Sequence, residues 1–313
     1  MRSDIGQRRT PAPGKAPTGP KSPASWRLST GDPIVAGLTV IEWLGGGAAH
    51  EAYLGWDEHL FAPVVVKVVR PDQTDHPGTR RGLLRETQML GRLNHPVIVR
   101  GFRAVLDGPR PHLVLEHVDG PRLSSLLRRD GRLPLQQLLP LGLEMCSALH
   151  YLQSSGVVHL DVKPGNIIMG SPPRLIDLSL ARPVEDALDL TRVVGTDAYL
   201  APEQCDPPSS GTPGHPADIW GLGTTLFEAA AGYRPFDRGA DDEDKPAAER
   251  FPQLEAEAFA LPPTVPGQVA KPILACLRHD PAQRPTAADL AALLEPLVDQ
   301  LPQPKIGGFK PRL

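Results

Sequence analysis

The hydrophobic pattern of this chain changes its period near residue 120, and that change limits the folds open to it. Between residues 34 and 116, short runs rich in β-branched and aromatic residues are separated by glycine, proline or aspartate. Such runs are typical of antiparallel strands. Beyond Gly120, apolar residues recur at helical spacing. We therefore expect an α+β fold, in which a small antiparallel sheet is followed by a larger, mostly helical part.

The expected elements can be placed by their residue ranges. Strands are expected at 38–44, 51–54, 64–69, 97–106 and 112–116, with one amphipathic helix at 80–93. Helices are expected at 135–153, 218–231, 273–277 and 286–297, the last with Thr286 available as its cap. The helix at 218–231 is apolar on all sides, which predicts that it is buried all round.

Composition excludes several classes of protein. The 313 residues are 40% hydrophobic and 22% charged, which is enough to build a core. The 33 basic and 36 acidic residues sum to −3, so a generally basic nucleic-acid-binding protein is excluded. The three widely spaced cysteines indicate a reducing, cytoplasmic setting. No apolar run approaches the roughly 18 residues of a membrane span.

Proline is unusually abundant and is concentrated at the N-terminus. The 37 prolines make up about 12% of the chain, against about 5% in average proteins. Residues 1–33 hold six prolines, six basic residues and two acidic ones, a composition typical of disorder. We expect disordered tails at 1–33 and 301–313. The first tail is either a solvated leader or a tether to an acidic surface.

Two features of the strand-rich part have the chemistry of a phosphate site. The sequence Leu44-Gly45-Gly46-Gly47 lets the backbone approach a phosphate closely, although a plain hairpin has the same glycines.

Lys67 lies within an otherwise apolar strand, where a buried cation needs an anion. Glu86, on the following helix, is the best-placed carboxylate. The alternative is an edge strand that exposes Lys67 to water.

A polar cluster between two apolar runs has the strongest signal. Within 159–166, Asp161 can accept a proton from a hydroxyl, Lys163 can neutralise a phosphate, and Asn166 offers an amide oxygen. Asp177 follows a second apolar run eleven residues later. Asn166 and Asp177 together would suit Mg²⁺, which prefers oxygen ligands. The alternative is a pair of local Asx turns.

The order of these motifs resembles that of the eukaryotic-type serine/threonine protein kinases. The resemblance runs from about residue 34 to about 297 and includes Ala201-Pro202-Glu203. It implies a catalytic domain at 34–300, with a small lobe at 34–116, a helical lobe at 120–300 and ATP between them. The short loops and the Pro/Ala/Arg-rich composition look like those of a bacterial member.

The resemblance also implies residue roles. Catalysis falls to Asp161, Lys163, Lys67 and Glu86, and metal binding to Asn166 and Asp177. The activation segment contains Thr191, Thr196 and Glu203, and the structural residues are His159, Asp218 and Arg284. The nucleotide would be contacted by the glycine loop, neighbouring strands and the hinge: Leu44, Gly45, Gly46, Gly47, Ala52, Val65, Lys67, Leu115, Glu116, His117, Val118 and Ile168.

The chain departs from the family pattern at three positions. His50 replaces the third glycine of the loop and either lies over the phosphates or faces solvent. Leu160 replaces the arginine that binds a phosphorylated activation loop, which predicts that such phosphorylation is not the main on-switch. Ser179 replaces a glycine and lacks its freedom at positive φ, which predicts a loop that flips less easily.

Two functional hypotheses follow. The first is an active kinase that uses ATP and Mg²⁺, or Mn²⁺, to phosphorylate serine and threonine of protein substrates and of itself. Lys163 and the Gly195-Thr196 pair resemble serine/threonine rather than tyrosine kinases. The second is a pseudokinase that serves as a nucleotide-binding or scaffolding module. Retention of Lys67, Glu86, Asp161, Asn166 and Asp177 favours the first.

Overall fold

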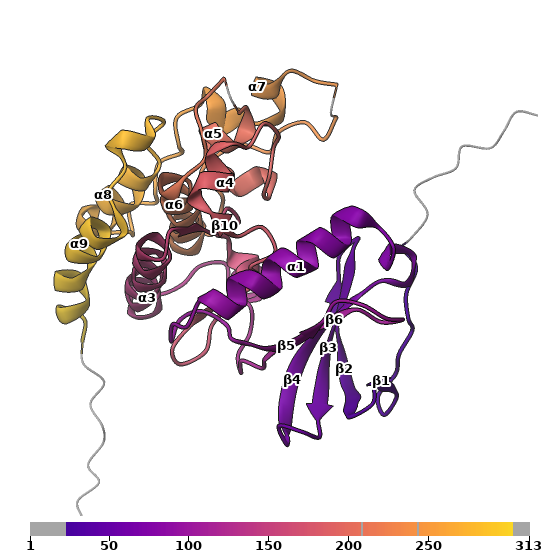
Figure 1. Ribbon diagram of the computed structural model, residues 1–313. Helices are drawn as coiled ribbons and strands as arrows, with labels where there is room; N and C mark the ends of the chain where they lie inside the picture. Colours follow the sequence, from indigo (N-terminus) through magenta and orange to yellow (C-terminus); the bar gives the residue numbers. More distant parts are fainter. Residues whose placement is uncertain (1–22, 208, 243, 303–313) are drawn as a thin grey trace, which may run out of the picture.

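The computed structural model describes residues 23–207, 209–242 and 244–302. Figure 1 shows a sheet at one end of the molecule and a group of helices at the other, with helix α1 (Pro77–Arg92) lying between them. The expected α+β architecture with two unequal lobes is confirmed. The ends at 1–22 and 303–313, where most of the predicted disorder falls, lie outside the described residues.

The small lobe is built on one antiparallel sheet. Its spatial order is β1-β2-β3-β4-β6-β5. The strands are β1 (Pro33–Val35), β2 (Leu38–Gly46), β3 (His50–Asp57), β4 (Ala62–Val69), β5 (Gly101–Val105) and β6 (His112–Glu116).

Alternation along β4 separates two faces of this sheet. Val64, Val66 and Val68 are fully buried in a core on one face. Val65 and Lys67 therefore point to the opposite face, because successive side chains of a strand alternate. This geometry explains how a lysine can sit within an apolar strand without facing that core.

The large lobe is helical, as the sequence predicts. Helix α6 is buried along nearly its whole length, with Trp220 and Phe227 fully buried, and it packs against α3 and α8. The helices are α2 (Leu123–Asp130), α3 (Leu135–Ser154), α4 (Val184–Leu188), α5 (Pro202–Cys205), α6 (His215–Ala231), α7 (Ala247–Arg250), α8 (Gly267–Cys276) and α9 (Ala287–Asp299).

Two short strand pairs hold the polar loops of this lobe. β7 (Val157–Val158) pairs with β10 (Arg182–Pro183), and β8 (Ile167–Ile168) pairs with β9 (Arg174–Leu175). The polar cluster at 159–166 therefore connects β7 to β8, and Asp177 follows β9. Both loops start from buried apolar anchors, which is why their positions are defined.

The structure corrects three expectations about these elements. β5 begins at Gly101, because Val97 and Val99 form backbone hydrogen bonds with Leu175 of the large lobe instead of continuing a strand. The short helices α2, α4, α5 and α7 and the strand β1 were not expected. Disorder was expected throughout 1–33, but residues 23–33 are part of the described structure and Trp26 contacts the sheet.

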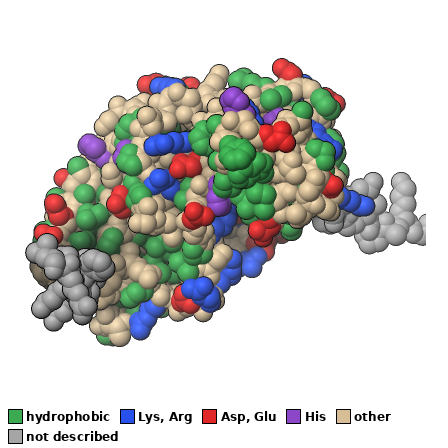
Figure 2. Space-filling model, turned by 90° about the horizontal axis from the view of Figure 1, so that it is seen from below, with side chains coloured by type: hydrophobic (Ala, Val, Ile, Leu, Met, Phe, Trp, Pro, Cys, Tyr) green, Lys and Arg blue, Asp and Glu red, His purple; other side chains and the backbone are tan. Residues whose placement is uncertain are grey.

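The charge distribution of the surface and the length of the helices relate to two kinds of partner, nucleic acid and membrane. Figure 2 shows acidic and basic side chains lying among hydrophobic ones on one face of the molecule, as the near-balanced charge of −3 implies. None of the helices in the described part of the chain is both long and apolar enough to cross a bilayer.

A buried ion pair joins distant parts of the large lobe and generates a stability prediction. Both guanidinium Nη atoms of Arg284 donate to the carboxylate of Glu203, at 2.6 and 2.8 Å, with both side chains at most 1% exposed. Arg284→Ala would leave that carboxylate buried and unpaired. We expect the free energy of unfolding to fall by about 3–5 kcal/mol, measured by urea denaturation.

The control for this prediction is an exposed pair. Arg238→Ala breaks the contact of Arg238 with Asp241, whose side chains are 77% and 80% exposed, and should change stability by less than about 0.5 kcal/mol. An Arg284→Ala protein as stable as the control would show that the buried pair contributes nothing.

Candidate functional site

A cleft of about 750 Å³ opens at the face of the sheet to which Lys67 points. Its volume is within the range of small-molecule sites. It brings together all twelve residues expected to contact the nucleotide: Leu44, Gly45, Gly46, Gly47, Ala52, Val65, Lys67, Leu115, Glu116, His117, Val118 and Ile168. Seven further lining residues were not predicted: Glu51, Val99, Gly120, Arg122, Ser125, Arg128 and Ile176.

Three charged side chains meet at one end of this cleft. The Lys67 ammonium lies 2.7 Å from Glu86 Oε2 and 3.0 Å from Asp177 Oδ1. The expected pairing of Lys67 with Glu86 is therefore present, and Asp177 joins it from the other lobe. Since Glu86 is 1% exposed, its charge needs this cation.

The charges of the three groups are mutually dependent. Burial alone would lower the pKa of Lys67, but the carboxylates of Glu86 and Asp177 raise it above its usual value. Burial would raise the pKa of Asp177, but the Lys67 ammonium holds it well below its usual range. Lys67 is therefore a cation and Asp177 an anion at neutral pH.

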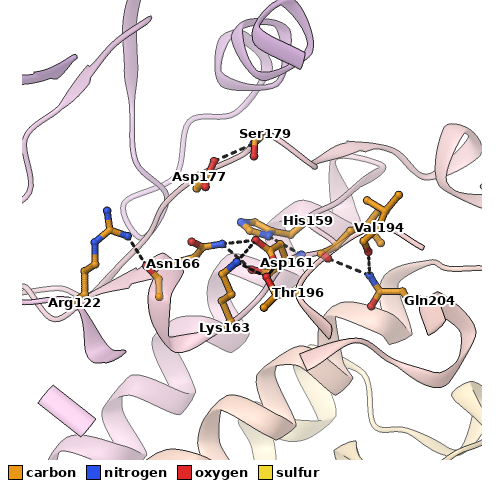
Figure 3. Close-up of polar contacts among 12 residues, drawn as sticks. Arg122, His159, Asp161, Lys163, Asn166, Asp177, Ser179, Val194, Thr196 and Gln204 are labelled. Carbon is orange, nitrogen blue, oxygen red and sulfur yellow. Dashed lines mark hydrogen bonds and ion pairs between the residues drawn. The ribbon is translucent and has the colours of Figure 1, made fainter. Parts of the chain in front are cut away.

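A second polar centre surrounds Asp161 on the loop between β7 and β8 (Figure 3). Its Oδ2 accepts hydrogen bonds from Lys163 Nζ at 2.6 Å and Asn166 Nδ2 at 2.9 Å. Its Oδ1 accepts one from Thr196 Oγ1 at 2.8 Å. Thr196 also contacts Lys163, so four side chains form one closed network.

A side chain of helix α6 binds the backbone of this loop. The two carboxylate oxygens of Asp218, a buried residue, accept hydrogen bonds from the N–H groups of His159 and Leu160, at 2.8 and 2.7 Å. Burial raises the pKa of Asp218, against the effect of His159 and these two N–H groups. Leu160 has a φ of 64°, a left-handed conformation unfavourable for leucine, so the loop is held against local strain.

The donor set of Asn166 and Asp177 fits a hard divalent cation. Both hydrogen bonds that Asn166 donates, to the backbone oxygen and Oδ2 of Asp161, use Nδ2, which leaves its amide oxygen as an available ligand. Asp177 offers a carboxylate that is 37% exposed. Only these two oxygen donors are expected from the protein, which suits Mg²⁺ because that ion keeps several water or phosphate ligands. Among the described residues, no cluster of three His, Cys, Asp or Glu side chains offers an alternative metal site.

Sequence reasoning missed two groups that support this loop. Gln204 Nε2 donates to the backbone oxygens of Leu160 and Val194, each at 3.0 Å. Arg122 donates to the backbone oxygen of Gly165 at 2.6 Å. No local pattern marks either residue, because their partners are backbone atoms. The Arg122–Gly165 and Gln204–Leu160 contacts each join residues more than forty positions apart in the sequence.

The structure bears on two of the departures. His50 does not face solvent but lines the cleft, and burial, together with the Lys67 charge, lowers its pKa to about 4. The left-handed residue of the second loop is Asp177, with a φ of 66°; Ser179 is not among the described residues with positive φ. Serine at position 179 therefore carries no backbone strain in this conformation.

The position of His50 predicts a pH-dependent stability. Its pKa is about 4 in the folded protein and 6.5 when exposed, so the unfolded state alone binds a proton between these values. Stability should therefore fall as the pH drops from 6.5 to 4. Relative to His50→Gln, the wild type should lose about 1–2 kcal/mol between pH 7 and pH 5, measured by urea denaturation at both values.

His150, an exposed histidine on α3, provides the control, since His150→Gln should keep the pH dependence of the wild type. Equal slopes for wild type and His50→Gln would mean that His50 titrates alike in the folded and unfolded protein.

Comparison with known proteins agrees with this geometry. The model of the protein kinase domain matches residues 38–293. Among curated relatives, serine/threonine-protein kinase PknB of Mycobacterium leprae is 35% identical over 62% of this chain and 32% of its own. PknB of Mycolicibacterium smegmatis is 31% identical over 80% of this chain and 41% of its own.

PkaA of Streptomyces coelicolor, a serine/threonine-protein kinase, is 35% identical over 73% of this chain and 42% of its own. The chain thus spans less than half the length of these curated relatives. The matched range of the family model contains both polar centres and all the residues that line the cleft. The chain therefore belongs to the protein kinase family.

Proposed function

We propose that this protein is a serine/threonine protein kinase that transfers the γ-phosphoryl group of ATP to hydroxyl groups of proteins, including its own. The observation that carries the proposal is the closed network around Asp161, placed next to a cleft that ends at a Lys–Glu–Asp triad. Family membership supports ATP as the phosphoryl donor and a divalent metal ion as the cofactor.

The hydrogen bonds of Asp161 favour one role for its carboxylate. A carboxylate has about four lone-pair sites. Three are used by Lys163, Asn166 and Thr196. The remaining site lies on Oδ1, where a substrate hydroxyl can donate its proton as its oxygen attacks phosphorus.

The phosphoryl group can then pass directly from ATP to the hydroxyl, without a covalent enzyme intermediate. The hydroxyl oxygen forms a bond to the γ-phosphorus, the bond from that phosphorus to the bridging oxygen breaks, and ADP leaves. The hydroxyl proton goes to Asp161. Lys163, 2.6 Å from the same carboxylate, neutralises charge on the transferring group. Positioning and charge stabilisation account for most of the catalysis in such a site.

The remaining predicted residues have supporting roles. Lys67, oriented by Glu86, would bind the α- and β-phosphates, and the residues of the hinge and strands would enclose the adenine. Asn166 and Asp177 would hold Mg²⁺, for which Mn²⁺ can substitute. When bound, this ion neutralises the phosphate oxygens and fixes their orientation.

Substrate class and cellular setting follow from the same features. Thr196 contacts both Lys163 and Asp161, which supports the serine/threonine assignment carried by the family resemblance. A protein substrate is favoured over nucleic acid because the charges of the chain nearly balance. The three cysteines that the structure describes are free and buried, which supports a reducing, cytoplasmic setting.

Phosphoryl transfer is the test of this function. Purified protein with labelled ATP and Mg²⁺ should phosphorylate itself or a generic protein. Asp161→Asn should lower the transfer rate by about 10²–10⁴-fold, while Kd for ATP stays the same. Lys67→Ala should also lose transfer. Glu295→Gln, at an exposed position of α9, should behave as the wild type.

A second candidate function is distinguished by the same assay. The altered residues His50, Leu160 and Ser179 favour a pseudokinase. Intact ATP binding without any phosphoryl transfer by the wild type would establish that alternative and reject catalysis.

Independence from activation-loop phosphorylation is a further part of the proposal. Leu160 is 2% exposed and offers no charge to a phosphate, while Thr196 already joins Lys163 to Asp161. Thr191 is exposed. We expect Thr191→Ala to retain kcat within about twofold of the wild type, whereas Thr196→Ala loses activity.

A large loss in Thr191→Ala, with phosphate found on Thr191 of the active wild type, would contradict this expectation. Burial, and next the positive charges of Arg85 and Arg192, lower the pKa of Arg182 to about 10. These three arginines would then be the receptor for the phosphate.

A further inference from the structure

A segment that precedes the family match packs against the sheet of the small lobe. The match begins at residue 38, but Trp26 is already half-buried. Its indole Nε1 donates to the backbone oxygen of Val69 at 2.8 Å. The guanidinium of Arg110 lies 4.6 Å from the centre of its ring, a cation–π contact. Residues 24–26 are therefore anchored beside the end of β4.

Arg70, directly after β4, connects this segment to the glycine loop. It is 6% exposed. Its Nη1 donates to the backbone oxygen of Ala24 at 2.9 Å, and its Nε donates to that of Gly47 at 2.6 Å. Its backbone N–H donates to Ala49 at 3.0 Å. One residue thus holds both sides of the turn at the tip of the loop.

The loop lies directly on this guanidinium. A Cβ atom at Gly46 would stand 3.0 Å from Nη2 of Arg70 and 2.6 Å from the backbone oxygen of His50. Only glycine allows this approach. The fit requires both the glycine and the arginine to stay in place.

Glu51 fixes the arginine from the other side. This residue of β3 is 1% exposed. Its Oε1 accepts from Arg70 Nη1 at 3.0 Å, and its Oε2 accepts from the Tyr53 hydroxyl at 2.9 Å and from the backbone N–H of Trp26 at 3.2 Å. A buried ion pair is weak evidence for a role in stability, but this one holds a guanidinium against a functional loop.

The contact with Gly47 also orients the next peptide group of the loop. Within one planar peptide, the C=O of a residue and the N–H of the next point in opposite directions. Binding of Gly47 O by Arg70 therefore turns the Ala48 N–H away from the arginine. Backbone N–H groups oriented in this way are the donors with which a loop binds phosphate.

We propose that Arg70 is a positioning residue for the glycine loop, and that Glu51 and the 24–26 segment hold it there and so set the affinity for ATP. This inference rests on the proposed use of the cleft for ATP. Arg70 touches no reacting atom. It lowers the free energy of the loop conformation that receives the phosphates.

The test is a comparison of ATP affinity with turnover. Arg70→Ala should raise Kd and KM for ATP about tenfold, the effect of losing one charge-assisted hydrogen bond. Glu51→Gln and Trp26→Ala should each raise them about threefold. KM for the protein acceptor, and kcat at saturating ATP, should stay near wild-type values. Glu51→Gln keeps the shape of the side chain and serves if Arg70→Ala fails to fold.

A second ion pair on the same sheet provides the matched control. Arg103 of β5 lies 2.5 Å from Asp57, the last residue of β3, whose carboxylate is fully buried. Arg103→Ala removes the cation that pairs with this carboxylate, which still accepts the N–H groups of His59 and Leu60, and the change is remote from the glycine loop. It should lower thermal stability as the other variants do and leave Kd for ATP unchanged.

The outcomes separate the inference from the proposed function. An unchanged Kd in Arg70→Ala and Glu51→Gln, or an equal rise in Arg103→Ala, would overturn the positioning role while the wild type still binds ATP. If the wild type binds ATP but transfers no phosphate, the Kd for ATP of the variants still tests the positioning role of Arg70. A wild type that does not bind ATP overturns both.

Discussion

The contact of the Lys67 ammonium with two carboxylates is the interaction on which the site depends. Lys67 belongs to β4, Glu86 to α1, and Asp177 to the loop after β9 of the other lobe. A buried cation is stable only with such partners. The sheet, the helix and the loop must therefore keep the relative positions that place these three groups within 3.0 Å. The cleft is the space enclosed by the elements that this requirement brings together.

The Asp161 network shows the same principle in the helical lobe, where its support is a buried carboxylate rather than a cation. Asp218 accepts the N–H groups of His159 and Leu160, and the apolar packing of α6 fixes Asp218 itself. These contacts hold the strained φ of Leu160, whereas Asp177, which also has a positive φ, is held by Lys67. Strain of this kind is concentrated at functional sites. Each polar centre is thus held in place by a well-packed element.

Strand β3 also carries Glu51, which forms a third polar centre with Arg70 and Tyr53. His50, Glu51 and Ala52 all line the cleft, and the buried side chains of Glu51 and Tyr53 are joined by a hydrogen bond. Because alternate residues of one strand serve the two faces, contacts made by the segment before the family match can reach the glycine loop.

The sequence by itself determined the lobes, most helices and strands, and the identity of the charged groups, because hydrophobic period and motif order are local properties of the chain. It predicted that Lys67 needed Glu86, since a buried cation restricts its partners to a few carboxylates. Only the tertiary structure decided that His50 lines the cleft, that Val97 and Val99 bind Leu175 instead of extending β5, and that Gln204 and Arg70 hold distant backbone oxygens. Backbone acceptors are alike at every residue, so no sequence pattern marks which of them a distant side chain will meet once the chain is packed.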